Sequence, residues 1–277
     1  MLAKPPSSPR STVAIATIEP GPASPGVSIA RSFRSAEGSG IDRVVGMASE
    51  KDVARLRGAD LGLWTVVSSP SPQDGDAFLD RLKEIRARSP VDVLVPATTR
   101  DVAALVAIEH ELAEAGVRTF LPSSGQLELL RSTAPHAPAR DGVPTNAYAV
   151  AAVGDGRGGV AGMAALRKID AEGDAQRWVG VAAQDAALRD RIRAFAAQTR
   201  LRGPVEIDLV GEPRGEFRLV RVEPRFPAWV HLFAGPGPNL PVLLVRLARG
   251  EDVEPQAELP GGPLLVGAAW EAWMTHD

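Results

Sequence analysis

The stretch Val205–Arg249, VEIDLVGEPRGEFRLVRVEPRFPAWVHLFAGPGPNLPVLLVRLAR, carries the pattern that decides the fold of the second half of the chain. In its first part, Val205–Val210 and Glu216–Val222 alternate apolar and polar residues on both sides of Gly211–Gly215. Such alternation around a glycine-bounded turn predicts two adjacent antiparallel strands. Its last part, Pro238–Arg249, is apolar and predicts a helix.

The residues before this stretch extend the predicted sheet. Gly154–Gly158 lacks the strand-to-helix setting and the Lys-Ser/Thr pair of a phosphate-binding loop, so we expect a hairpin turn there. Three strands and one helix are predicted around it, at Asn146–Val153, Gly159–Arg167, Arg177–Val181 and Asp185–Thr199. Residues 145–277 are therefore expected to form an α+β lobe with an antiparallel sheet.

The first half has a different pattern, in which short β-branched runs alternate with longer amphipathic stretches. The predicted strands are Thr12–Ile18, Asp42–Ala48, Leu63–Ser68, Val91–Pro96 and Arg118–Leu121. The predicted helices are Gly26–Ala36, Asp74–Ser89 with Asp76 as N-cap, Asp101–Ala115 and Ser124–Arg131. This alternation indicates βαβ units, so residues 11–132 are expected to form an α/β domain with a doubly wound parallel sheet.

Composition sets further limits on the chain. Residues 1–10 are rich in Pro and Ser and are expected to be a disordered tail, and the Pro/Ala/Gly-rich residues 133–144 a linker. No apolar run is long enough to span a membrane, so we expect a cytoplasmic protein that does not bind membranes. The absence of cysteine excludes disulfides and thiolate metal sites. A net charge of −3 with dispersed basic residues argues against a nucleic-acid partner.

Val205–Arg249 resembles the carboxy-terminal part of the ATP-grasp fold, found in biotin carboxylase, carbamoyl phosphate synthetase and related carboxylate–amine ligases. The resemblance rests on a Gly-Pro pair before an acidic strand, a second strand ending in Pro-Arg, and Gly-x-Asn-Leu-Pro at the start of a helix. Residues 11–132 resemble the α/β domain that precedes the ATP-grasp domain. The resemblance implies ATP, magnesium and an acyl phosphate intermediate.

The resemblance also implies roles for particular residues. Glu206 stands at the position of the first metal carboxylate, and Lys168 resembles a phosphate-side cation. In Arg221-Val222-Glu223-Pro224-Arg225, Arg221 stands where the family has a bridging carboxylate, and Glu223 where it has an Asn. Arg225 and Lys168 are thus the candidate catalytic residues, and Lys168, Glu206 and Glu223 the candidate nucleotide contacts. The candidate metal ligands, weakened or lost because of Arg221, are Glu206, Asp208 and Glu223.

Two departures from the family pattern predict lost nucleotide chemistry. A guanidinium donates hydrogen bonds and cannot ligate a cation, so Arg221 opposes magnesium binding. Only residues 133–147 separate the two matching parts, where the family has a small lobe that carries a phosphate-binding Lys and grips adenine. The lid over the nucleotide is therefore expected to be missing.

Alternatives remain for the site, for the function and for the partners. Strand alternation predicts an internal ion pair between Arg221 and the acidic residues, or a weak cation site on Glu206, Asp208 and Glu223. We predict a degenerate, non-catalytic binding or scaffold subunit with no cofactor; the alternatives are an active carboxylate–amine ligase that uses ATP and magnesium, and a sensor of a small ligand. Expected partners are a second copy, a complete ligase, or a small-molecule or peptide ligand. His231 is expected to be a packed or surface residue rather than a catalytic base, and Asn239 to cap a helix.

Overall fold

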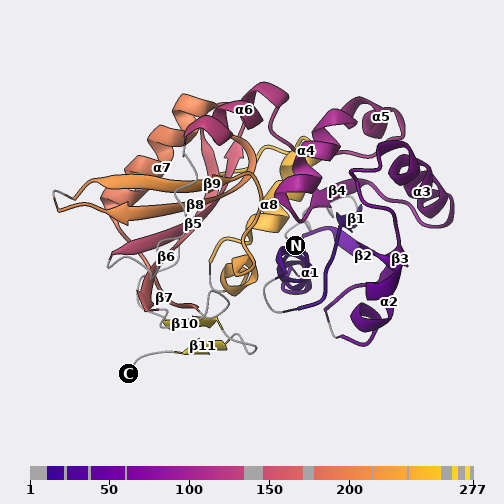
Figure 1. Cartoon of the computed structure of the whole chain (residues 1–277), viewed down its shortest axis with the longest axis horizontal. Coiled ribbons are helices and arrows are strands. Elements are labelled where there is room, and N and C mark those ends of the chain that lie inside the picture. Colours follow the sequence, from indigo (N-terminus) through magenta and orange to yellow (C-terminus); the bar gives the residue numbers. More distant parts are fainter. Residues whose placement is uncertain are drawn as a thin grey trace, which may run out of the picture.

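The computed structural model describes residues 11–21, 24–36, 39–59, 61–133, 146–170, 178–213, 215–235, 237–256, 264–267 and 272–274. The predicted tail 1–10, and all but the first residue of the predicted linker 133–144, lie outside these ranges. The chain forms a four-stranded parallel sheet and a separate seven-stranded antiparallel sheet, which Figure 1 shows side by side. Among the described residues, no helix is both long and apolar enough to cross a membrane.

The parallel sheet has the order β3-β2-β1-β4. Its strands are β1 (Ser11–Ala16), β2 (Ile41–Ala48), β3 (Thr65–Ser68) and β4 (Val93–Pro96), which confirms four predicted strands. The fifth, Arg118–Leu121, was wrong, because it makes only an isolated bridge between Arg118 and Val93. Pro122 follows it and has no N–H to donate, and the carbonyl of Leu121 accepts instead from the side chain of Arg202.

Helices cover both faces of this sheet, as a doubly wound arrangement requires. One face packs against α1 (Pro25–Arg34) and α2 (Glu50–Arg57), and the other against α3 (Gly75–Arg88), α4 (Thr99–Ala107) and α5 (Glu109–Glu114). The helix α6 (Ser124–Thr133) completes the first half.

Several predicted helix boundaries need correction. Asp76 does not cap α3; Asp74 precedes the helix, and its side chain makes no capping hydrogen bond. The predicted helix over residues 101–115 divides into α4 and α5 at Ile108, whose φ is −117°. Helix α2 was not predicted, because only Asp52 and Leu56 of its residues are buried and so leave no apolar period in the sequence.

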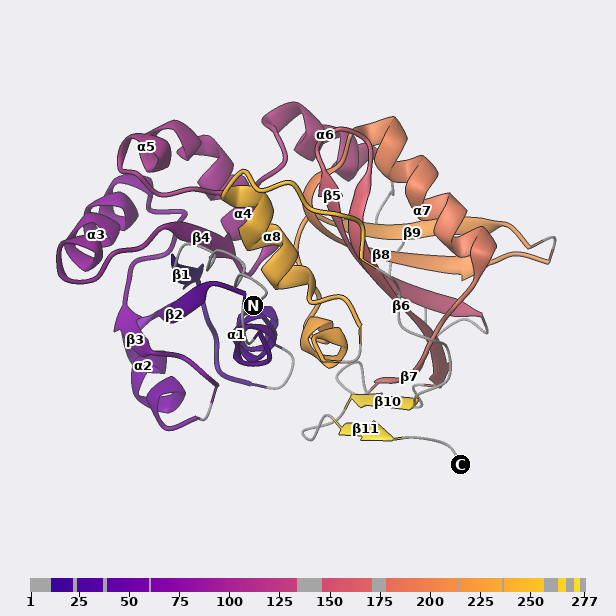
Figure 2. The ribbon, with the colours of Figure 1, turned by 180° about the vertical axis from the view of Figure 1, so that it is seen from behind.

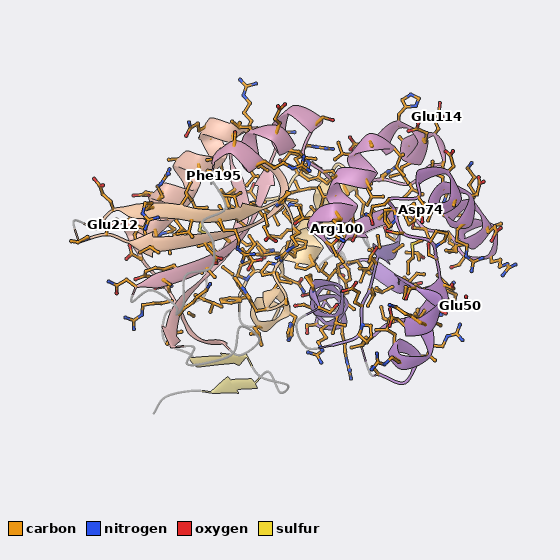
Figure 3. The ribbon with its side chains drawn as sticks, viewed as in Figure 1. Glu50, Asp74, Arg100, Glu114, Phe195 and Glu212 are labelled. Atoms are coloured by element: carbon orange, nitrogen blue, oxygen red, sulfur yellow. The ribbon has the colours of Figure 1, made fainter. Side chains whose placement is uncertain are left out.

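The antiparallel sheet has the order β11-β10-β7-β6-β5-β8-β9. Its strands are β5 (Ala147–Asp155), β6 (Val160–Asp170), β7 (Trp178–Ala182), β8 (Arg202–Gly211), β9 (Phe217–Glu223), β10 (Leu264–Gly267) and β11 (Ala272–Met274). The five predicted strands and the hairpin turn after β5 are confirmed, whereas β10 and β11 were not predicted. Helix α7 (Ala186–Thr199), where Figure 3 labels Phe195, covers one face, and Phe195 is buried in the apolar cluster between this helix and the sheet.

The other face of the antiparallel sheet packs against α8 (Leu240–Ala248) and the short 3-10 helix η1 (Val230–Phe233). Figure 2 shows α8 between the two sheets. One apolar cluster runs from Val13 and Ile15 of β1 through Leu243 of α8 to Ala151 of β5. The Asn239 side chain accepts from the N–H of Val242, which confirms its predicted capping role. The two halves therefore share a core.

Two further contacts join the halves. The Nδ1 atom of His231 lies 2.6 Å from the Oγ atom of buried Ser28 in α1, so His231 is packed as predicted. Gly203 has a φ of +90°, and a Cβ there would lie 2.7 Å from the carbonyl oxygen of Phe120. Only a residue without a side chain fits where β8 comes this close to the backbone of Phe120. This gives a structural reason for glycine in the Gly203-Pro204 pair.

Candidate functional site

The candidate site lies on β8 and β9, and strand alternation brings its residues together. Val205, Ile207 and Leu209 of β8 pack in the cluster under α7. Glu206 and Asp208 therefore face the opposite way, toward the first half of the chain. Across the ladder, Glu206 pairs with Glu223 and Asp208 pairs with Arg221. Three of the five candidate side chains thus share one face of a two-stranded ladder with Arg221.

Arg221 lies at the centre of this arrangement and contacts all three carboxylates. Its Nε is 2.8 Å from Oδ2 of Asp208, its Nη1 is 2.6 Å from Oε1 of Glu223, and its Nη2 is 3.5 Å from Oε1 of Glu206. The predicted ion pairs between the two strands are therefore present.

Two further cations complete what we call the ionic cluster, formed by Lys168, Glu206, Asp208, Arg221, Glu223 and Arg225. The Nη1 atom of Arg225 is 2.7 Å from Oε2 of Glu206, and its Nη2 contacts Oε2 of Glu223. The Nζ atom of Lys168 is 3.1 Å from Oδ1 of Asp208. All six carboxylate oxygens of the cluster are consequently in contact with a cationic side chain.

Because the ionic cluster is partly buried, the pKa of each of Glu206 and Arg221 depends on the charges of its neighbours. The Glu206 side chain is only 8% exposed, and burial raises its pKa, an effect that Arg225 and Arg221 partly oppose. Burial alone would lower the pKa of Arg221, but Glu206, Asp208 and Glu223 raise it more, and the net shift is upward. Arg221 is therefore firmly cationic, and the cluster has a formal charge of zero when its carboxylates are ionised.

This donor set does not fit a pair of magnesium ions. Magnesium is held by carboxylate and phosphate oxygens in octahedral geometry, and here a guanidinium stands among the carboxylates. A divalent ion that ligated them would have to displace Arg221 from its contacts. Among the described residues, no three or more His, Asp and Glu side chains form a group that could hold a metal ion.

The first half of the chain also reaches the ionic cluster, which the sequence did not predict. The Oγ1 atom of Thr99, in the first turn of α4, lies 3.5 Å from Oε2 of Glu223. Figure 3 places the neighbouring residue Arg100 in the middle of the molecule, between the two sheets. The strand-end side of the parallel sheet thus faces the ionic cluster. The sequence predicted that a helix begins after β4, but nothing in it indicated that Thr99 at the start of this helix contacts Glu223.

A second polar group that the sequence did not single out lies at the ends of β1 and β4. Asp101, 1% exposed, accepts a 2.9 Å hydrogen bond from Oγ1 of Thr17 and forms a capping box with Thr98. Burial raises the pKa of Asp101, and the hydrogen bonds from Thr17 and Thr98 partly offset that shift. Thr17 has a φ of 56°, which is strained for a β-branched residue. The Thr-x-x-Asp spacing was the only trace of this group in the sequence.

Known structures share the fold of the chain, although no protein-family model and no curated protein matches it. An L-amino acid ligase from Bacillus licheniformis superposes with a TM-score of 0.55 at 12% identity, covering 94% of this chain and 79% of that one. The biotin carboxylase domain of 2-oxoglutarate carboxylase from Hydrogenobacter thermophilus is a dimer in complex with magnesium ADP and bicarbonate. It superposes with a TM-score of 0.58 at 12% identity, and the match covers 94% of this chain and 74% of that one.

The beta-gamma-ATP complex of biotin carboxylase from Campylobacter jejuni gives a TM-score of 0.59 at 12% identity. The match covers 92% of this chain and 74% of that one, so these proteins are longer. The matches span both sheets of the present chain. It therefore has the fold of the ATP-grasp carboxylate–amine ligases.

Proposed function

We propose that this protein is a degenerate ATP-grasp protein that serves as a non-catalytic binding or scaffold subunit of an ATP-dependent ligase system. One observation carries the proposal: Arg221 contacts Glu206, Asp208 and Glu223, the three candidate metal ligands of the sequence analysis. The pairing occupies the carboxylates that would otherwise ligate magnesium.

The size of the electrostatic effect supports this interpretation. At a separation of 4 Å and an effective dielectric constant of 20, each unit of charge changes the interaction energy by about 4 kcal/mol. Replacing a carboxylate by a guanidinium changes the local charge by two units. Phosphoryl transfer relies on cations and positioning for nearly all of its stabilisation, so a site with this change is a poor catalyst.

The short segment between the two halves supports the proposal independently. Thr133 ends α6, and β5 begins at Ala147. A stretch of this length is far below the roughly 40 residues that a unit needs to fold alone. A clamp over the nucleotide would have to come from a partner, which fits a subunit that works within a larger assembly.

Titration calorimetry with magnesium ATP tests the proposal. We expect no saturable heat for the wild-type chain, whereas a micromolar affinity that is lost in Glu206→Gln would contradict the proposal. A thermal melt of Glu206→Gln would establish that the variant is folded. Arg193→Gln on the outer side of α7 is a control for the effect of a surface substitution, because Arg193 is 62% exposed and, among the described residues, has an ion pair with Asp190 alone, at 3.8 Å.

An active carboxylate–amine ligase is the second candidate, because Lys168 and Arg225 lie within the same ionic cluster as Glu206. This function needs ATP, magnesium and a clamp supplied by a partner. Release of ADP that depends on both a carboxylic acid and an amine would support it, with Lys168→Ala as the variant that should abolish the release. No release with any acid–amine pair would favour the scaffold role.

We also propose that the chain forms a homodimer or joins a complete ligase. The expected apolar face left uncovered by the missing lobe has no support among the described residues, whose exposed large hydrophobic side chains are Trp64 and Leu129, so the shared fold carries this proposal. A biotin carboxylase domain with this fold is a dimer. Sedimentation velocity across a hundredfold range of concentration should show association, and a monomer at every concentration would contradict self-association.

A further inference from the structure

Asp-Gly pairs are positions at which a protein backbone can rearrange. The backbone nitrogen of the glycine attacks the carboxyl carbon of the aspartate side chain, and glycine has no side chain that would hinder this approach. The chain contains three such pairs, at residues 74–75, 141–142 and 155–156. The second pair lies outside the described residues, and the structure gives the other two opposite surroundings.

The first pair, Asp74 and Gly75, leaves both reacting groups free. Asp74 is exposed and directly precedes α3, where Figure 3 labels it. Its side chain makes no capping hydrogen bond and no ion pair within the part of the chain that the structure describes. Gly75 is the first residue of α3, where an N–H has no partner inside the helix, and no described group outside the helix accepts from it.

The third pair, Asp155 and Gly156, is held by hydrogen bonds instead. The Oδ1 atom of Asp155 accepts from the N–H of Arg157 at 2.7 Å and from the N–H of Gly159 at 2.9 Å. The N–H of Gly156 donates to the carbonyl of Leu201 at 2.8 Å. Ring closure at this pair requires a local opening that breaks all three hydrogen bonds, so the contacts of the hairpin turn protect it.

We propose that residues 74–75 are a site of spontaneous isoaspartate formation. The nitrogen of Gly75 bonds to Cγ of Asp74, and the carboxyl OH leaves with the N–H proton as water, which gives a succinimide ring. Water then adds to one of the two ring carbonyls. Addition at Cγ restores Asp74, and addition at the α-carbonyl carbon leaves the main chain running through the side chain. One water is lost and one is regained, so the mass of the chain is unchanged.

The modification would alter the first turn of α3. The N–H of Phe78 donates to the carbonyl of Asp74 at 2.9 Å, and Phe78 is 1% exposed in the apolar cluster beside the parallel sheet. Isoaspartate adds one methylene to the main chain and moves this carbonyl, so the hydrogen bond is lost. The modified chain should therefore melt at a lower temperature. The site is independent of the proposed scaffold role, so either can fail without the other.

Peptide mapping of the aged full chain tests the proposal, with fragmentation that assigns the isomer to residue 74 or to residue 155. Ageing at neutral pH and physiological temperature should give a peptide of unchanged mass that contains isoaspartate at residue 74. The isomer fraction at residue 155 should be lower by at least about tenfold, because three hydrogen bonds must break there first. In urea that unfolds the chain, the two fractions should become similar.

Gly75→Ala and Asp74→Ser are the matched variants. A Cβ on Gly75 would lie 3.6 Å from Cγ2 of Ile108, an ordinary contact, so alanine fits the fold while its methyl group hinders ring closure. The isomer at residue 74 should fall severalfold in Gly75→Ala and vanish in Asp74→Ser, which has no carboxyl group and keeps a residue type suited to a helix N-cap. Thermal melts should show that both variants are folded. Equal isomer fractions at residues 74 and 155 in the folded chain, or no isomer at residue 74, would overturn the proposal.

Discussion

The Nε atom of Arg221 lies 2.8 Å from Oδ2 of Asp208, its cross-strand partner on β8. This contact fixes the guanidinium plane so that its other nitrogens reach Glu206 and Glu223. Because the side chain of Arg221 is only 34% exposed, solvent screens these interactions incompletely. Among the described residues, residue 221 is therefore the one cation that contacts all three acidic residues, while Arg225 and Lys168 each hold part of them.

Arg221→Glu should create a metal-dependent protein. The substitution changes the formal charge of the ionic cluster from zero to −2, so we expect lower stability without metal and recovery with magnesium. Magnesium at 100 times its dissociation constant would add about 2.7 kcal/mol to the free energy of unfolding. Differential scanning fluorimetry with MgCl₂, against NaCl of equal ionic strength, measures this. Arg221→Gln is the matched control and should not respond, and a wild-type chain stabilised as strongly as Arg221→Glu would contradict the prediction.

Arg225→Met should destabilise the chain more at high pH than at low pH. The substitution leaves the buried Glu206 without its 2.7 Å partner, and removal of one partner from a buried pair costs about 3–5 kcal/mol. Burial already raises the pKa of Glu206 and will raise it further in the variant. A carboxyl with a raised pKa contributes stability below its ordinary pKa and loses that contribution as pH rises through the folded value. The loss should therefore be small at pH 5 and full at pH 8.

Urea denaturation at both pH values measures the Arg225→Met effect. Arg218→Met on the same strand is the matched control, because Arg218 is 61% exposed and pairs with Glu212 at the surface. Such a surface pair is worth about 0–1 kcal/mol, so the control should show little change and little pH dependence. A loss for Arg225→Met that is equal at pH 5 and pH 8 would exclude Glu206 as its source.

The ionic cluster could be predicted because a strand has a period of two residues. Alternation alone places Glu206 and Asp208 on one face, and the resemblance aligned Arg221 and Glu223 opposite them. The contacts of Thr99 with Glu223 and of Ser28 with His231 join residues more than a hundred positions apart. No local pattern encodes such contacts, since they arise only when the two sheets pack.

The errors in secondary structure have equally specific causes. Helix α2 touches the core through few residues, so its sequence is mostly polar and carries no apolar period. Residues 118–121 were predicted as a strand, yet only Arg118 bonds to the edge of the sheet, at Asp92 and Leu94, and the carbonyl of Leu121 accepts from the Arg202 side chain instead. A pocket of about 180 Å³ between β3 and α3 could not be predicted, because an empty space depends on packing and not on any motif.

A pair of variants at Thr17 separates its hydrogen bond from its backbone strain. Thr17→Val keeps the shape but removes the hydroxyl that donates to buried Asp101, which should cost about 1–3 kcal/mol. The cost should grow with pH, because without this donor the pKa of Asp101, already raised by burial, rises further. Thr17→Ser keeps the hydroxyl and relaxes the β-branched strain, so its stability should match or exceed the wild type. Chemical denaturation measures both variants, and equal losses would refute this role of the hydroxyl.

Gly203→Ala should disrupt the junction between the two halves. The new Cβ would lie 2.7 Å from the carbonyl oxygen of Phe120, and the φ of +90° is unfavourable for alanine. Because the clash is with backbone, relief requires β8 to move away from residues 120–122, and we expect a loss of at least about 2 kcal/mol. Gly125→Ala in α6 is the matched control, since nothing lies within 4 Å of its added Cβ, and it should stabilise the helix by about 0.4–1 kcal/mol. Equal unfolding midpoints for the two variants would mean that the approach of β8 to Phe120 does not constrain the fold.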